Sequence, residues 1–495
     1  MAMNSKGFSF PSAMRFERAS TSLRTASYLM CVVALGSLLT GCDNSPLNED
    51  ETTFHLRTLN LVEDSPLLEI DMDDTTVASP GYGGASNFSA GHPGRHDMSF
   101  NAILPADLDD DDDDDDTSTP VSGDVSYTFL ANTDYTLVAY GRLSDIRTYM
   151  VEGFDQRDDV EEEKLILQFT HAAPEVGSVD VYITSAQAGI TTRQYVDTLA
   201  LTETSSPLEL TLIRDDDDLD DDATLTAEVV VELMTTGTSE ALYRSDAITF
   251  SEQNRLLMAI ANASGPGPGM AKLVLVGGSE YRHSRDGAAL KFVHASHDTP
   301  ALDVTVGSGL ADPLARNIAF RQSSDYVAID DGENGMIAVP AGANSPYVFF
   351  EEFDAIAAGY YTAYALGPAS IVDAVVVAAQ ARGIPTQTSF RFMHAAASLE
   401  DQEALDLYLR LPGEAVDFDD DDTVANTSSL TYQTATSYFT LKEGDYDIYF
   451  AYAGTSTFVM GPTPFHVANG EITTLLLIDA EDGSLELMPV TDTAN

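Results

Sequence analysis

A single sequence unit recurs four times along the chain, and this repetition constrains the fold more than any other feature. At residues 290–306 it reads Leu-Lys-Phe-Val-His-Ala-Ser-His-Asp-Thr-Pro-Ala-Leu-Asp-Val-Thr-Val, and it returns at 167–183 and, with three extra residues in its middle, at 390–409. A divergent copy occupies 56–72. Apolar and polar residues alternate at both ends of the unit, which is typical of strands with one buried face. We therefore expect two strands per unit, joined by a turn, in an all-β protein.

Three of the four copies carry a histidine followed by an aspartate. The spacing is nine residues in two copies and twelve in the third (180 − 171, 303 − 294 and 406 − 394), for the pairs His171 and Asp180, His294 and Asp303, and His394 and Asp406. The first copy keeps the spacing of nine with Asn60 and Glu69 (69 − 60). From marker to marker the chain advances by 111, 123 and 100 residues (60 to 171, 171 to 294, 294 to 394). Such periods exceed those of solenoid repeats and indicate whole domains in tandem.

The markers and the stretches between them predict four tandem domains. Each is long enough to form a core of its own. The first domain is the most divergent, because glycine-rich residues 81–84 and residues 91–97 predict a long irregular stretch in its middle. The predicted boundaries are 51–155, 164–281, 288–381 and 388–489.

The third and fourth copies resemble a known family. Phe-Val-His-Ala-Ser at 292–296, followed by Ala-Leu-Asp-Val at 301–304, is similar to the opening of the bacterial and archaeal domain-of-unknown-function family 4397. Thr-Ser-Tyr at 436–438 and Glu-Gly-Asp-Tyr at 443–446 resemble a later part of that family. The resemblance implies immunoglobulin-like β-sandwich modules in envelope or secreted proteins, and it brings no known chemistry with it.

The beginning of the chain resembles a bacterial lipoprotein precursor. Leu-Thr-Gly-Cys at 39–42 is similar to a lipobox and follows an apolar run at 28–39, so residues 1–41 are identified as a signal peptide, with synthesis starting at Met1 or Met14. The apolar run is short for a transmembrane helix, which is the weaker alternative. The resemblance implies cleavage before Cys42 and acylation of that residue. We therefore expect a lipid anchor in the bacterial cell envelope, in either the inner or the outer membrane.

The mature chain would be extremely acidic. Removing residues 1–41 takes away four basic residues and one acidic residue, so the net charge changes from −56 to −59 (−56 − 3). Repulsion of this size is relieved by salt, because the Debye length shortens from about 10 Å at 0.1 M to about 3 Å at 1 M, and a saline habitat is the simplest explanation. The charge excludes nucleic acid as an expected partner, since phosphate binding needs a basic surface.

Three runs of aspartate, at 107–116, 215–222 and 419–422, raise the question of calcium. Hard cations bind carboxylate oxygens, but the runs lack the ordered glycine and glutamate of an EF-hand loop. We expect solvated loops that associate loosely with divalent cations, and no cofactor.

The repeated histidines are expected to be structural. His171, His294 and His394 have the strand parity of the buried residues before them, so each imidazole should point inward and bond turn backbone at one end of its sandwich. Asp180, Asp303 and Asp406 have the opposite parity and should face turns or solvent. A catalytic reading would need a nucleophile beside the histidine.

The first domain holds one weak candidate for a metal site. His92 and His96 are four residues apart and Asp97 is adjacent, a grouping that zinc could use. Pro93 and Gly94 between them prevent a regular helical turn, so a loop without metal is the alternative.

Two functional hypotheses follow. The first is a lipid-anchored envelope protein whose tandem sandwiches form a non-catalytic interaction or spacer array, contacting an envelope protein or glycan, because repetition raises avidity or reach. The alternative is a hydrolase or glycan-processing protein with its site in the irregular part of the first domain, since separation in space, not sequence, decides whether carboxylates can cooperate. The usual nucleophile-elbow, zinc-protease and phosphate-loop motifs are absent from the sequence, so an enzyme is the less favoured hypothesis.

Overall fold

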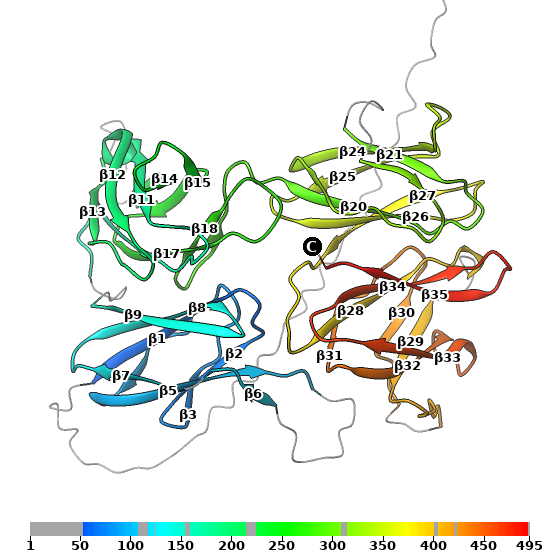
Figure 1. Cartoon of the computed structure of the whole chain (residues 1–495), viewed down its shortest axis with the longest axis horizontal. Helices are drawn as coiled ribbons and strands as arrows, with labels where there is room; N and C mark the ends of the chain where they lie inside the picture. Colours follow the sequence, from blue (N-terminus) through cyan, green and yellow to red (C-terminus); the bar gives the residue numbers. More distant parts are fainter. Residues whose placement is uncertain are drawn as a thin grey trace, which may run out of the picture. The chain divides into compact units, whose positions relative to one another are not determined.

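The computed structural model describes residues 53–106, 117–122, 124–153, 159–213, 224–307, 314–399, 404–419 and 423–493. By internal contacts the chain divides into Met1–Glu51 and Thr52–Asn495, and all the described residues belong to the second unit. The predicted signal peptide, Cys42 and most of the three aspartate runs lie outside the described residues. Apart from two short 3-10 turns, at Ala186–Ala188 and Ala397–Leu399, the regular elements of the described part are strands (Figure 1). The predicted all-β fold class is confirmed.

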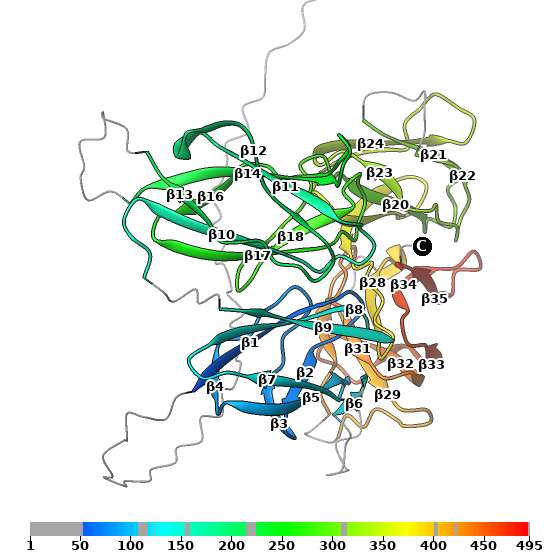
Figure 2. The same cartoon turned by 60° about the vertical axis from the view of Figure 1, so that its left-hand side comes forward.

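The third domain shows the strand pattern in its simplest form, two four-stranded sheets (Figures 1 and 2). One sheet has the order β23-β20-β26-β27 and the other β22-β21-β24-β25. We call the first the marker sheet, because its strand β20 ends on the marker His294, and the second the opposite sheet. The strands are β20 (Ala288–His294), β21 (Leu302–Val306), β22 (Ala315–Ile318), β23 (Val327–Ile329), β24 (Gly332–Pro340), β25 (Phe349–Ala355), β26 (Tyr360–Leu366) and β27 (Asp373–Ala379).

The fourth domain repeats this pattern strand for strand. Its marker sheet has the order β31-β28-β34-β35 and its opposite sheet β30-β29-β32-β33. The last strand runs past the predicted boundary at 489. The strands are β28 (Thr388–His394), β29 (Leu405–Arg410), β30 (Thr427–Leu430), β31 (Phe439–Leu441), β32 (Gly444–Tyr452), β33 (Phe458–Val467), β34 (Ile472–Asp479) and β35 (Leu485–Thr491).

The first domain keeps the pattern with its sixth strand broken in two. Its marker sheet is β4-β1-β8-β9 and its opposite sheet β3-β2-β5-β6, with β7 also paired to β5. The strands are β1 (Phe54–Val62), β2 (Leu68–Met72), β3 (Thr75–Ala78), β4 (Ser89–Gly91), β5 (Gly94–Ile103), β6 (Ser118–Pro120), β7 (Val125–Phe129), β8 (Asp134–Arg142) and β9 (Asp145–Glu152).

The second domain differs by a broken sixth strand and one added edge strand. Its marker sheet is β13-β10-β17-β18-β19 and its opposite sheet β12-β11-β14-β15, with β16 paired to β14. The strands are β10 (Lys164–His171), β11 (Val179–Ser185), β12 (Ile190–Leu199), β13 (Leu208–Thr211), β14 (Thr226–Thr235), β15 (Ala241–Arg244), β16 (Ile248–Ser251), β17 (Asn254–Asn262), β18 (Ala271–Leu275) and β19 (Glu280–Tyr281).

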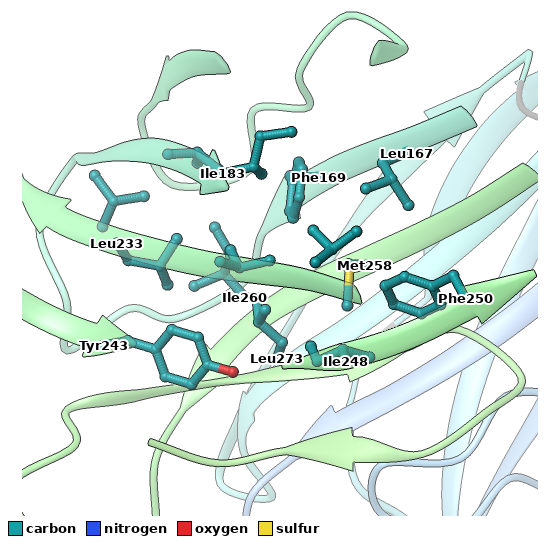
Figure 3. Packing of buried hydrophobic residues seen from close by; sticks show 14 of the residues in the cluster. Leu167, Phe169, Ile183, Leu233, Tyr243, Ile248, Phe250, Met258, Ile260 and Leu273 are labelled. Carbon is teal, nitrogen blue, oxygen red and sulfur yellow. The ribbon is translucent and has the colours of Figure 1, made fainter. Parts of the chain in front are cut away.

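Each sandwich has its own apolar core between its two sheets. In the second domain, Phe169 of β10, Ile183 of β11 and Met258 of β17 are fully buried and converge between the layers (Figure 3). Replacing one such side chain by alanine typically costs about 2–5 kcal/mol, so each core contributes strongly to the stability of its domain.

The prediction of a long irregular stretch in the first domain was wrong in part. Residues 94–103 form β5, a central strand of the opposite sheet, and its side chains Met98, Phe100 and Ala102 are buried in the core. The period-2 alternation of these three residues was the strand signal. The cluster of glycine, proline and histidine just before them concealed it.

When the broken sixth strand is counted as one, the seventh strands of the four domains are β8, β17, β26 and β34. In every domain the first and seventh strands are paired in parallel, whereas the other strand pairs are antiparallel. In this register each marker faces the seventh strand at the same place, opposite Ala139, Ile260, Ala365 and Leu477. Residues of the four domains can therefore be compared by their offset from the marker.

Candidate functional site

The three marker histidines are buried, and two of them, His171 and His294, are bonded to the loop that follows them. In the second domain, Nε2 of His171 donates to the carbonyl oxygen of Gly177 at 3.0 Å, and Nδ1 accepts from the backbone N–H of Ala173 at 3.2 Å. In the third, Nε2 of His294 donates to Pro300 O at 3.1 Å and Nδ1 accepts from Ser296 N at 3.3 Å. Both ring nitrogens of these two residues are thus used by the chain's own backbone.

Burial lowers the pKa of all three marker histidines, because an imidazolium loses its hydration inside the protein. The effect is largest for His394, whose pKa is lowered to about 4, with Asp479 opposing the shift. The ring of His394 lies edge-on to Tyr432 at 5.7 Å between centroids. We infer that the three imidazoles are neutral near pH 7.

Asn60 makes the same two kinds of bond in the first domain. Its Oδ1 accepts from the backbone N–H of Val62 at 3.0 Å, as the histidine Nδ1 does two residues before its donor. Its Nδ2 donates to Pro80 O at 3.1 Å and to Ser65 Oγ at 3.0 Å. An amide presents an accepting oxygen and a donating nitrogen, as a neutral imidazole presents one accepting and one donating nitrogen, which explains why asparagine serves at this position.

The repeated aspartates hold turns. Asp303 accepts from the N–H of Asn317 at 2.7 Å and from that of Gly342 at 2.8 Å, and these backbone bonds, the one from Gly342 foremost, lower the pKa of its carboxyl. Asp406 accepts in the same way from Ser429 and Gly454, at 2.9 and 2.8 Å. Asp180 accepts from Thr198 Oγ1 at 2.6 Å and, more distantly, from the N–H of Gly237 at 3.4 Å.

The structure does not bring His92 and His96 together as paired side-chain ligands. His96 lies on β5, where its Nδ1 is 2.6 Å from Asp73 Oδ2 and its Nε2 is 2.8 Å from the backbone carbonyl of His92. Asp97 binds Ser126 instead. Burial alone would lower the pKa of His96, but the bonds to Asp73 and His92 raise it. Among the described residues, no group of three or more His, Cys, Asp or Glu side chains is placed to hold a metal ion.

The glycine-rich residues 81–84 carry a side chain that reaches beyond the first domain. The ring of Tyr82 lies 4.5 Å from Nζ of Lys272 in the second domain and 4.9 Å from the guanidinium of Arg382. Lys272 is fully buried and donates to Glu280 at 2.6 Å. This part of the first domain therefore contributes to a contact between domains.

Sequence reasoning missed an extensive apolar surface, the outer face of the marker sheet. In the first two domains these faces pack against each other, with Leu59, Val138, Leu257 and Ala259 fully buried. In the last two domains Val293, Tyr364 and Leu476 are buried in the same way. The signal was available, because strands buried on both faces are continuously apolar instead of alternating.

A polar cluster lies within the contact between the third and fourth domains. The buried carboxylate of Asp492, just after β35, accepts hydrogen bonds from Tyr438 at 2.9 Å, from Thr362 at 3.3 Å and from Thr474. The guanidinium of the buried Arg391 is 3.9 Å from the same carboxylate. Nothing in the spacing of these residues along the chain indicated that they would meet.

Among the described residues, no helix is both long and apolar enough to cross a membrane.

Comparison with known proteins identified one family. The sequence model described as "Domain of unknown function (DUF4397)" matches residues 54–182, 288–408 and 401–495, which confirms the resemblance seen in the sequence. No curated protein matches the chain.

Two solved structures show remote likeness. The Bacillus anthracis TIE protein is 10% identical, with a TM-score of 0.15, over 89% of this chain and 69% of its own. A streptococcal ancillary pilin is 8% identical, with a TM-score of 0.15, over 64% of this chain and 99% of its own. Similarity at this level carries no argument about function.

Proposed function

The chain belongs to the DUF4397 family, and on that premise we propose that it is a lipid-anchored protein of the bacterial cell envelope whose four sandwiches form a non-catalytic interaction or spacer array. One observation carries the proposal: the same sandwich is built four times, and the side chains of three of its four marker residues, Asn60, His171 and His294, bind the backbone of their own domain. Repetition of a module raises avidity or reach, whereas a single catalytic centre does not need four copies. The expected partners are envelope proteins or glycans.

The anchor rests on the lipobox-like residues 39–42. Growing cells with an alkyne-bearing fatty acid should label the wild-type chain and leave Cys42→Ala unlabelled and released from the membrane fraction. Equal labelling of the two proteins would refute the anchor without touching the rest of the proposal.

The non-catalytic array is tested with purified protein starting at residue 42. Incubation with chromogenic esters, phosphates and glycosides should give no turnover that a point substitution abolishes, and whole-cell crosslinking should capture envelope components. Deleting residues 75–122 cannot test the alternative hydrolase, because that deletion removes the core strand β5. Tyr82→Ala is the better probe, because it changes the glycine-rich stretch and leaves β5 in place.

A further inference from the structure

Large apolar contacts join the first domain to the second and the third domain to the fourth. We infer that the cooperative unit of this chain is a pair of unlike sandwiches, the first with the second and the third with the fourth. The outer face of each marker sheet is a dedicated interaction surface, and it packs against the corresponding face of the other domain in its pair. This inference concerns how the array is assembled and goes beyond its proposed role.

Both members of each pair use the same positions. These are the residues just before and just after the marker, and the seventh-strand residues one place before and one place after the residue that faces the marker. The self-complementary use of one surface is the pattern of a two-fold interface. The positions are Leu59, Leu61, Val138 and Tyr140 meeting Thr170, Ala172, Ala259 and Ala261, and Val293, Ala295, Tyr364 and Leu366 meeting Met393, Ala395, Leu476 and Ile478.

The two members of a pair are nevertheless different, and the difference alternates along the chain. Four residues before the position facing the marker, the seventh strand has Tyr135 in the first domain and Tyr361 in the third. Each tyrosine hydroxyl accepts a hydrogen bond of 2.9 Å from the backbone N–H five residues earlier, that of Leu130 or Ile356. The second and fourth domains have Leu256 and Thr473 at this position.

A second position alternates with it. Two residues after the position facing the marker stand Gly141 and Gly367 in the first and third domains, at φ of 98° and 92°. An added Cβ would lie 2.8 Å from a carbonyl oxygen at either glycine. The second and fourth domains have Asn262 and Asp479 there, whose side chains accept from the N–H of Glu175 at 3.2 Å and of Ser398 at 3.0 Å.

A third contact follows the same alternation. Four residues after the marker, Asp64 and Asp298 accept from the backbone N–H of Leu143 and Ala369, at 2.6 and 2.7 Å. The repeat that accounts for all these observations is two domains long.

The test is hydrogen exchange, followed by mass spectrometry, on the protein starting at residue 42. Leu476→Asp places a charge on the outer face of the fourth marker sheet, where the side chain is fully buried. We expect on the order of tenfold faster exchange in the strands of both the third and the fourth domain, with the first two unchanged. Leu257→Asp should do the reverse. Ile371→Asp makes the same chemical change at a side chain that is 75% exposed and should alter neither pair.

Two outcomes would overturn the inference. Faster exchange confined to the substituted domain would make the single sandwich the unit, and faster exchange in all four domains would make the whole array the unit. If the aspartate variants fail to fold, Leu476→Ala and Leu257→Ala in a urea gradient give the same readout with a smaller perturbation.

Discussion

The two contacts between paired domains use the same surface but stabilise it differently. Between the first and second domains the buried Lys272 binds Glu280 of its own domain, and Arg57 donates to Thr136 at 2.7 Å. Two polar contacts cross between these domains: Arg142 lies 3.9 Å from Glu175, and Asn262 donates to the carboxylate of Glu63. A neutral hydrogen bond of 2.8 Å between the hydroxyl groups of Tyr149 and Thr170 also crosses that contact. Between the third and fourth domains the carboxylate of Asp492 accepts from both partners.

The comparison separates the features that both contacts share from those that only one of them has. Three residues before the marker, the outer face carries a long polar side chain in every domain, each nearly buried: Arg57, Gln168, Lys291 and Arg391. Both contacts combine buried apolar residues with a polar residue at this position. Only the second contact includes a fully buried acid, Asp492, so its stability should depend more strongly on charge than that of the first.

The largest expected difference comes from removing that acid. Asp492→Ala should destabilise the third and fourth domains by about 4 kcal/mol, because it leaves Arg391 buried without its carboxylate. The first two domains should keep their stability. Urea unfolding read by hydrogen exchange measures both pairs in one sample.

The control is Asp482→Ala, at an exposed turn where the carboxylate binds only the nearby Ser484. Its expected cost is below about 0.5 kcal/mol. Equal effects of the two substitutions would show that Asp492 is not a link between the domains.

The next largest expected effect is a loss of stability at acid pH, caused by protonation of the marker histidine His394. The pKa of His394 is about 4 in the folded domain and about 6.5 when unfolded, so the unfolded state binds the extra proton and stability falls as the pH drops from about 6.5 to about 4. The loss should be about 3 kcal/mol for the fourth domain. His394→Asn should remove it, since Asn60 already fills this position in the first domain.

The reciprocal variant, Asn60→His, should make the first domain more sensitive to acid than it is in the wild type. Urea midpoints measured between pH 4 and 7 would show this, and the same dependence in wild type and His394→Asn would contradict the assignment.

The smallest effects come from single hydroxyl groups in the two contacts. Tyr438→Phe removes a donor to a carboxylate and should cost about 2 kcal/mol, whereas Tyr149→Phe removes a neutral bond and should cost about 1 kcal/mol. Both rings keep their packing. Equal costs, measured by urea unfolding, would mean that the charge on Asp492 adds nothing to the second contact.

The sequence was sufficient for what lies close together along the chain. Alternating residues such as Leu290, Phe292 and His294 predicted strands and their buried face, and the marker spacing predicted four tandem domains. The pairing of domains could not be predicted from the sequence, because a residue such as Leu476, fully buried on the outer face, is apolar in the same way as a core residue. Asp492 could not be assigned either, since it meets Thr362 130 residues away.

The parallel pairing of the first and seventh strands also fixes where the chain leaves each sandwich. The seventh and eighth strands are antiparallel neighbours, so the eighth ends near the height at which the first began. Entrance and exit share one end of the marker sheet. A short return is then enough to start the next domain beside the previous one.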